Sequence, residues 1–160
     1  MKTLPSALFP NCTFTAEEAA GFYDVIPQGY TRAVALYLST DTVKDDDAIA
    51  KAAAFFDRVH EWDAFGKNAF LCAGEDAEDA DMVAEYFDFY REEAPDVFDV
   101  EDVAALSLSD MVARLQLSGM GTHGSGVKQV FNVDFTLGYD QLLSVYFDGD
   151  SKFSHMAWES

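Results

Sequence analysis

Residues 130–147 decide the fold, and they read VFNVDFTLGYDQLLSVYF. Apolar side chains stand at every second position, at Phe131, Val133, Phe135 and Leu137 and again at Leu143, Val145 and Phe147. Alternation of this kind is typical of antiparallel strands that turn one face to the core. The stretch therefore predicts two paired strands, joined by a turn at Gly138 to Gln141.

The same period of two continues on both sides of these strands. Apolar and polar residues also alternate upstream, at Leu115 and Leu117, and downstream, at Met156 and Trp158. Asp148-Gly149-Asp150 supplies a turn before the last strand, because Asp and Gly favour the backbone conformations of turns. From Ala113 onward we therefore expect four strands in an antiparallel meander with one face on the core.

Two helices are predicted upstream of the meander. The first begins near Thr42, has an acidic first turn and runs to about Phe65, and we expect Gly66 to end it. Its apolar residues recur every three and four positions and so share one face, formed by Ile49, Ala52, Phe55, Phe56, Val59 and Trp62. The second helix spans about Asp76 to Glu93 and ends before Pro95, since proline disfavours helix at the preceding residue.

The N-terminal part is predicted as a strand region. Residues 1–29 are irregular, with short strand-like pieces around Phe22 to Val25. Ala33 to Leu38 is apolar on both faces and predicts a buried, central strand. No internal repeat or linker divides the chain. The sequence thus predicts a single α+β domain over residues 1–160, in which an antiparallel C-terminal meander packs against two amphipathic helices.

Composition bounds the class of protein. A chain of 160 residues that is 49% hydrophobic can build a core. Cys12 and Cys72 are too few for a disulfide framework and lack zinc-ligand spacing, so both are expected as reduced thiols, with Cys72 in an apolar setting. No apolar run reaches the ~18 residues of a membrane helix, and prolines interrupt the region where a signal peptide would lie. We therefore expect a cytoplasmic protein.

The net charge limits the partners. At pH 7 the chain carries a formal charge of -19. Nucleic acids and anionic membranes are bound through Lys and Arg that neutralise their phosphates, so neither is an expected partner. The same charge speeds encounter with a basic protein, and it also keeps a protein soluble.

The negative charge is concentrated in the helical half. Residues 75–102 hold thirteen Asp and Glu against a single base, Arg91. On the second predicted helix, four carboxylates at spacings of four, three and four line the side opposite the aromatic residues: Asp81, Glu85, Asp88 and Glu92. These are the predicted binding residues, because a face kept only for solubility normally mixes both signs. A solvated helix face is the alternative.

No cofactor, metal site or catalytic residue is predicted. Residues 119–124 match GxGxxG, but a strand follows them, so no helix N-terminus faces a pyrophosphate. His123, beside Ser125, is a candidate general base, yet no carboxylate is placed in sequence to orient it. Asp148-Gly149-Asp150 lacks the further ligands of a calcium loop. The three histidines, His60, His123 and His155, have no metal-ligand spacing.

The C-terminal strands carry a family resemblance. VFNVDFTLG at 130–138 and LLSVYFDG at 142–149, with a chain end at Glu159-Ser160, resemble a bacterial family catalogued as a domain of unknown function and numbered two thousand and four. In element order the resemblance extends back to Ala33. The family usually has Tyr where this chain has Phe135, and the loop at 119–126 is richer in glycine here. The resemblance implies an α+β fold in a bacterial, cytosolic setting and brings no agreed activity.

The sequence therefore predicts a non-catalytic protein-binding module whose acidic helix face meets a basic protein. An immunity protein or inhibitor that masks a toxin acting on nucleic acid would work in this way, because complementary charge gives fast association. Two alternatives stay open. One is a small-molecule hydrolase-like enzyme that uses a cleft between sheet and helices, with His123. The other is a homo-oligomer that uses an exposed sheet face containing Leu142 and Tyr146.

Overall fold

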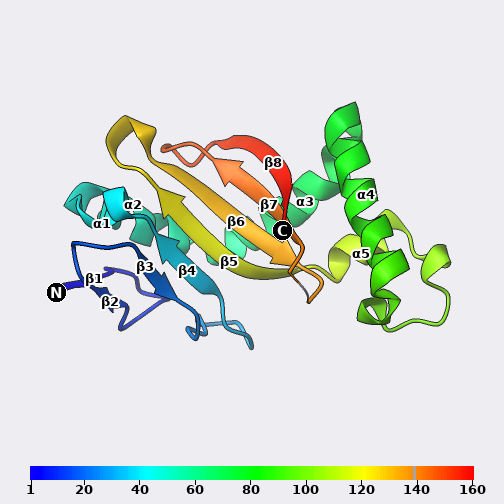
Figure 1. Ribbon diagram of the computed structural model, residues 1–160, viewed down its shortest axis with the longest axis horizontal. Helices are drawn as coiled ribbons and strands as arrows, with labels where there is room; N and C mark the ends of the chain where they lie inside the picture. The colour runs from blue at the N-terminus through cyan, green and yellow to red at the C-terminus, as the bar shows by residue number, and fades with distance from the viewer. Residues whose placement is uncertain (139) are drawn as a thin grey trace.

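The computed structural model describes residues 1–138 and 140–160, which form an α+β fold (Figure 1). The strands of the main sheet lie in the order β3-β4-β5-β6-β7-β8. Their bounds are Ala20–Phe22 (β3), Ala35–Leu38 (β4), Gln116–His123 (β5), Val130–Thr136 (β6), Leu142–Phe147 (β7) and Phe153–Glu159 (β8). All neighbours are antiparallel except β4 and β5, which are parallel. The predicted α+β class and the antiparallel order of β5 to β8 are confirmed.

The helices lie in the connection between the parallel strands β4 and β5. They are Thr40–Val43 (α1), Asp46–Phe56 (α2), Val59–Leu71 (α3), Ala77–Glu93 (α4) and Leu108–Ala113 (α5), with 3-10 turns at Cys72–Glu75 (η1), Pro95–Phe98 (η2) and Val103–Ala105 (η3). A further 3-10 turn, Gly126–Lys128 (η4), lies between β5 and β6. α2 and α3 lie behind the sheet in Figure 1, whereas α4 stands at its end, beside β8. A separate small sheet pairs Lys2–Thr3 (β1) with Thr13–Phe14 (β2).

The core forms between the sheet and the helices behind it. The ring of Phe55 on α2 stacks on Phe131 of β6 with centroids 4.3 Å apart. On α3, Phe70 meets Phe135 edge to face at 5.4 Å. The predicted apolar helix face is confirmed, since all its members are buried: Ile49, Ala52, Phe55, Phe56, Val59 and Trp62. The sheet therefore buries one face against α2 and α3.

The prediction of one helix from Thr42 to Phe65 is wrong. The helix is interrupted after α1, where Asp45 caps α2 by accepting hydrogen bonds from two backbone amides. It is interrupted again between α2 and α3. α3 continues beyond Gly66 to Leu71. A β-carbon at position 66 would collide with the ring of Phe135. Gly66 therefore does not end a helix, and it lets α3 approach the sheet closely.

Three further expectations need correction. β4 is buried on one face only: Leu36 and Leu38 are inside, but Tyr37 is 40% exposed because no helix covers its side. β5 runs through the predicted glycine loop as far as His123. Cys72 is exposed rather than in an apolar setting.

Within the described residues, no helix combines the length and apolar character that crossing a membrane requires.

Candidate functional site

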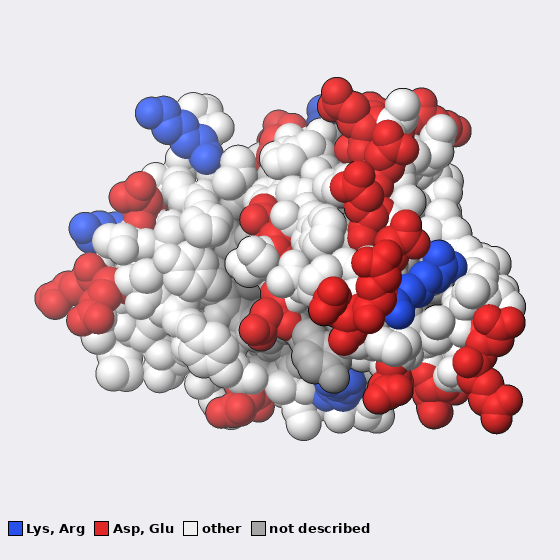
Figure 2. Space-filling model, turned by 45° about the vertical axis from the view of Figure 1, so that its right-hand side comes forward, with Lys and Arg blue, Asp and Glu red and all other residues white. Residues whose placement is uncertain are grey.

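The four predicted binding residues lie together on α4. Asp76 caps this helix, as its side chain accepts hydrogen bonds from the amides of Glu78 and Asp79. The side of α4 that faces the molecule is buried at Val83, Tyr86, Phe87 and Tyr90. The other side carries Asp81, Glu85, Asp88 and Glu92, all exposed, which we call the acidic stripe. Figure 2 shows acidic side chains following this helix, with few basic ones among them.

One member of the acidic stripe is partly neutralised. Arg91 Nη1 lies 3.0 Å from Asp88 Oδ1, and the other end of the guanidinium donates to the carbonyl oxygen of Leu106 at 2.9 Å. Among the described residues, no ion pair involves Asp81, Glu85 or Glu92. In the part of the chain that the structure describes, these three carboxylates therefore face solvent without a basic partner.

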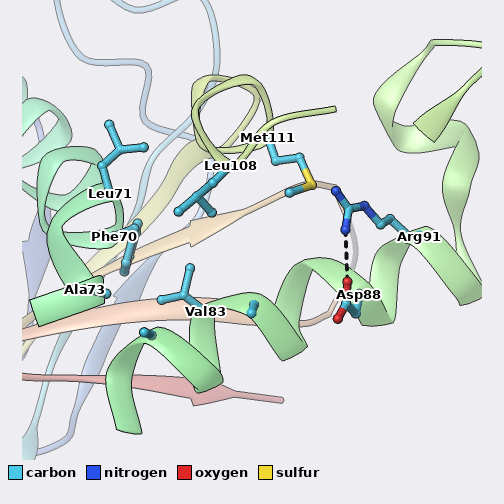
Figure 3. Close-up of a pocket in the computed structure, with 11 residues that line it drawn as sticks. Phe70, Leu71, Ala73, Val83, Asp88, Arg91, Leu108 and Met111 are labelled. Carbon is cyan, nitrogen blue, oxygen red and sulfur yellow. Dashed lines mark hydrogen bonds and ion pairs between the residues drawn. The ribbon is translucent and has the colours of Figure 1, made fainter. Parts of the chain in front are cut away.

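An apolar pocket of about 330 Å³ opens beside the acidic stripe, between α3, η1, α4 and α5. Figure 3 shows apolar side chains from these elements pointing into a common space, with the Asp88–Arg91 pair at one end. Leu71 is 41% exposed and Leu108 is 37% exposed. Adjoining exposed apolar side chains often mark interaction sites, so the mouth of the pocket is suited to an apolar group of a partner.

The pocket and the acidic stripe share one helix. Successive residues of an α-helix are turned by about 100°, so Ala80, Ala84 and Asp88 form a row between the buried side and the stripe. All three line the pocket, and Asp88 belongs to both features. A partner that places an apolar side chain in the pocket would therefore bring its neighbouring residues against the carboxylates.

The arrangement is suited to binding. Protein interfaces commonly join an apolar, desolvated centre to a polar rim, and a few anchors in pockets carry most of the affinity. The described residues that line this pocket include one titratable acid, Asp88, which is paired with Arg91, and include no Ser, Cys, Lys or His. Among the described residues, no group of three or more His, Cys, Asp or Glu is placed to hold a metal ion.

The histidines are separated. His60 stacks on Tyr30 at 4.9 Å and contacts the carbonyl oxygen of Gln28. His155 stacks on Tyr146 at 4.5 Å, on the sheet face that α2 and α3 leave open. His123, the candidate base, tilts against Tyr37 at 5.2 Å. Within the part of the chain that the structure describes, no hydrogen bond joins His123 to Ser125, so the proposed activation of that hydroxyl has no geometric support.

His123 does line a second concavity, which the sequence interpretation missed. This concavity lies on the open sheet face, and Asp134 of β6 also lines it. Asp134 accepts hydrogen bonds from Ser144 at 2.7 Å and from the amide of Asn132 at 3.0 and 3.1 Å. Burial raises the pKa of Asp134, while these hydrogen bonds oppose the rise. In the sequence, Asp134 shows only as an outward strand position.

Leu142 and Tyr146, the residues considered for self-association, also lie on the open sheet face, and both are half-buried. The Tyr146 hydroxyl donates to Glu159 Oε1 at 2.8 Å. The homo-oligomer therefore stays a prediction.

Comparisons of the chain with protein-family models, with curated proteins and with solved structures find no match. The family resemblance of the C-terminal strands stays a prediction, and the geometry of the two concave surfaces is what bears on function.

Proposed function

We propose that this protein is a non-catalytic binding module for a basic protein, which docks on α4. The observation that carries the proposal is the position of the acidic stripe along one edge of an apolar pocket. The pocket would take an apolar side chain of the partner, and the stripe would meet Lys and Arg residues next to it. An inhibitor or immunity protein of a toxin that acts on nucleic acid is one such module, because the nucleic-acid site of the toxin is itself basic.

The two parts of the surface would have different roles in binding. Exposed carboxylates act through a long-range field that raises the rate of encounter and is screened by salt. An apolar side chain held in a pocket mainly slows dissociation, as most affinity differences between related complexes lie in that rate. The proposal therefore predicts that charge and cavity variants separate in kinetics.

The charge test uses the double variant Glu85→Lys and Glu92→Lys, which leaves the Asp88–Arg91 pair in place. Its matched control, Glu17→Lys with Glu18→Lys, makes the same change in net charge at exposed positions outside α4. The partner is first captured on the immobilised wild-type protein, and its association is then followed at several salt concentrations. We expect the α4 variant to associate about tenfold or more slowly at low salt, with the difference shrinking as salt rises.

The pocket test uses Ala84→Phe, which fills the pocket from an exposed position on its wall. Ala50→Phe, at an exposed position of α2, is the matched control. Faster dissociation of the Ala84 variant alone would support an anchor in the pocket. Equal slowing by both charge variants, or salt-independent association, would instead mean that the acidic stripe serves solubility.

A further inference from the structure

The open sheet face contains a hollow of about 260 Å³ over strands β4, β5 and β6. Gly119 and Gly121 of β5 form its floor, and both are buried. Tyr37 of β4 stands on one side, while Asn132 and Asp134 of β6 stand on the other. α2 and α3 cover the opposite face of the sheet (Figure 1), so the hollow opens away from them.

The hollow exists because β5 lacks side chains at two positions. A β-carbon on Gly121 would lie 2.7 Å from Asn132 Oδ1, and one on Gly119 would lie 3.7 Å from Asp134 Oδ2. A bulge between Leu117 and Gly119 sets this alignment, since it places Gly119 rather than Ser118 across from Asp134. Bulges commonly redirect side chains in this way. Here the bulge keeps a serine side chain out of the hollow.

Two oxygen atoms point into the space above the glycines. Asp134 Oδ1 accepts from the Ser144 hydroxyl and from the side-chain amide of Asn132. Among the described residues, Oδ2 accepts only from that amide, at 3.1 Å, and it faces Gly119. Asn132 Oδ1 faces Gly121, and no described residue donates a hydrogen bond to it. A carboxylate has room for about four donors. Asp134 Oδ2 and Asn132 Oδ1 can therefore accept further hydrogen bonds.

The charge around the hollow is negative. No Lys or Arg lines it. Glu159 of β8 lies on the same sheet face, and its negative charge raises the pKa of Asp134. His123, which lines the hollow, acts on that pKa in the opposite direction. A cation that carries hydrogen-bond donors is suited to this space, because it would pair with the partly buried carboxylate of Asp134.

We propose that the hollow binds the ammonium or guanidinium group of a small, free organic cation. Asp134 Oδ2 and Asn132 Oδ1 accept its hydrogen bonds, and the ring of Tyr37 offers a face on which cations are attracted. Drug-sized ligands occupy about 300–1,000 Å³, so this hollow fits a head group with a short alkyl chain. The site is separate from α4 and goes beyond the proposed protein binding.

The test is a titration of the isotope-labelled protein, followed by backbone amide NMR at constant ionic strength. Agmatine and n-butylamine supply the two cationic groups, and 1-butanol is the uncharged probe of similar shape. We expect saturable shifts at Gly119, Gly121 and Asn132 with the cations and none with the alcohol. Asp134→Asn should weaken cation binding by about tenfold or more, because a charged hydrogen-bonded partner is lost.

Matched variants separate the possible causes. Asp81→Asn removes one carboxylate from the exposed side of α4 and should leave the titration unchanged. Gly119→Ala keeps Asp134 but places a methyl group in the hollow, and it should also weaken binding. Dispersed amide spectra would show whether the two sheet variants fold. If Asp134→Asn does not fold, Gly119→Ala still tests the site.

Three results would overturn the proposal. The first is the absence of saturable shifts with both cations, and the second is equal binding by wild type and both sheet variants. The third is binding of N-acetyl-arginine methylamide without binding of the free amines, which would point to a side chain of a partner protein. The double variant Glu85→Lys with Glu92→Lys should not change the binding of the cation to the hollow. This proposal and the α4 proposal can therefore fail separately.

Discussion

The acidic stripe on α4 and the carboxylate of Asp134 show how differently one functional group behaves in two surroundings. The stripe holds its carboxylates in solvent, three of them outside any ion pair among the described residues. Asp134 is recessed between strands and is held by Ser144 and Asn132. Water screens the first group, so its members act together and over distance. Partial desolvation strengthens the hydrogen bonds of Asp134, so this carboxylate acts alone and at hydrogen-bond range.

The difference teaches that acidic residues have to be weighed by environment rather than by number. The stripe contributes four of the 29 acidic residues of the chain, but each exposed carboxylate there contributes little free energy individually. Asp134 contributes one charge to the total, yet its partners are specific and its burial raises its pKa. The comparison can be tested through stability as well as through binding.

Removal of a donor from Asp134 should have the largest effect on stability. Ser144 is fully buried, and its hydroxyl donates to the carboxylate at 2.7 Å. We expect Ser144→Ala to lower the free energy of unfolding by about 1–3 kcal/mol at about pH 8, because the partly buried carboxylate of Asp134 loses a donor. Chemical denaturation measures this. Ser154→Ala, at an exposed position of β8, is the matched control, and equal losses in both variants would contradict the distinction.

The pH dependence of Asp134→Asn should be a smaller effect of known sign. Because the pKa of Asp134 is raised on folding, the native state holds its proton to higher pH than the unfolded chain does. The stability of the wild type should therefore fall as pH rises from the ordinary pKa of an aspartate to the raised one. His123, Glu159, Tyr146 and Tyr37 share this sheet face, and the variant leaves them intact.

Melting temperatures measured across that pH window test the sign. Above the window, Asp134→Asn should be at least as stable as the wild type, since it removes a desolvated charge and keeps the shape of the side chain. A wild-type protein that gains stability over the Asn variant as pH rises would mean that the hydrogen bonds outweigh burial.

Relief of repulsion on the acidic stripe should have the smallest effect. Glu85 lies four residues after Asp81 and three before Asp88, so Glu85→Lys turns two repulsive helix pairs into attractive ones. We expect a gain of about 0.2–0.5 kcal/mol per pair at low salt, lost at high salt. Thermal melts at two salt concentrations measure it. A clear loss of stability would show that Glu85 has a structural contact.

Local patterns were enough to predict much of the fold. The period of two predicted the strands β6, β7 and β8, and the proline after the second predicted helix indicated where α4 ends. The same helix pattern placed Asp81, Glu85, Asp88 and Glu92 on one side, and they are exposed there. These features depend on neighbours within a few residues, which a sequence displays directly.

Features that depend on distant contacts were not predictable. Gly66 has the appearance of a helix end, but the ring of Phe135 explains it, 69 residues away along the chain. The pocket beside α4 needs α3, α4 and α5 to meet. The hollow needs β5 parallel to β4, a bulge at Ser118 and two glycines across from Asn132 and Asp134.

By itself the sequence determined the class of fold and the exposed acidic side of one helix. That nucleic acid is not a partner stays a prediction from the net charge. Periodicity and charge are local or additive properties, so they can be read without coordinates. Only the tertiary structure decided where concave surfaces form and which carboxylate is desolvated. Concavity and burial arise from the packing of elements far apart in the chain, and no short stretch of residues records that packing.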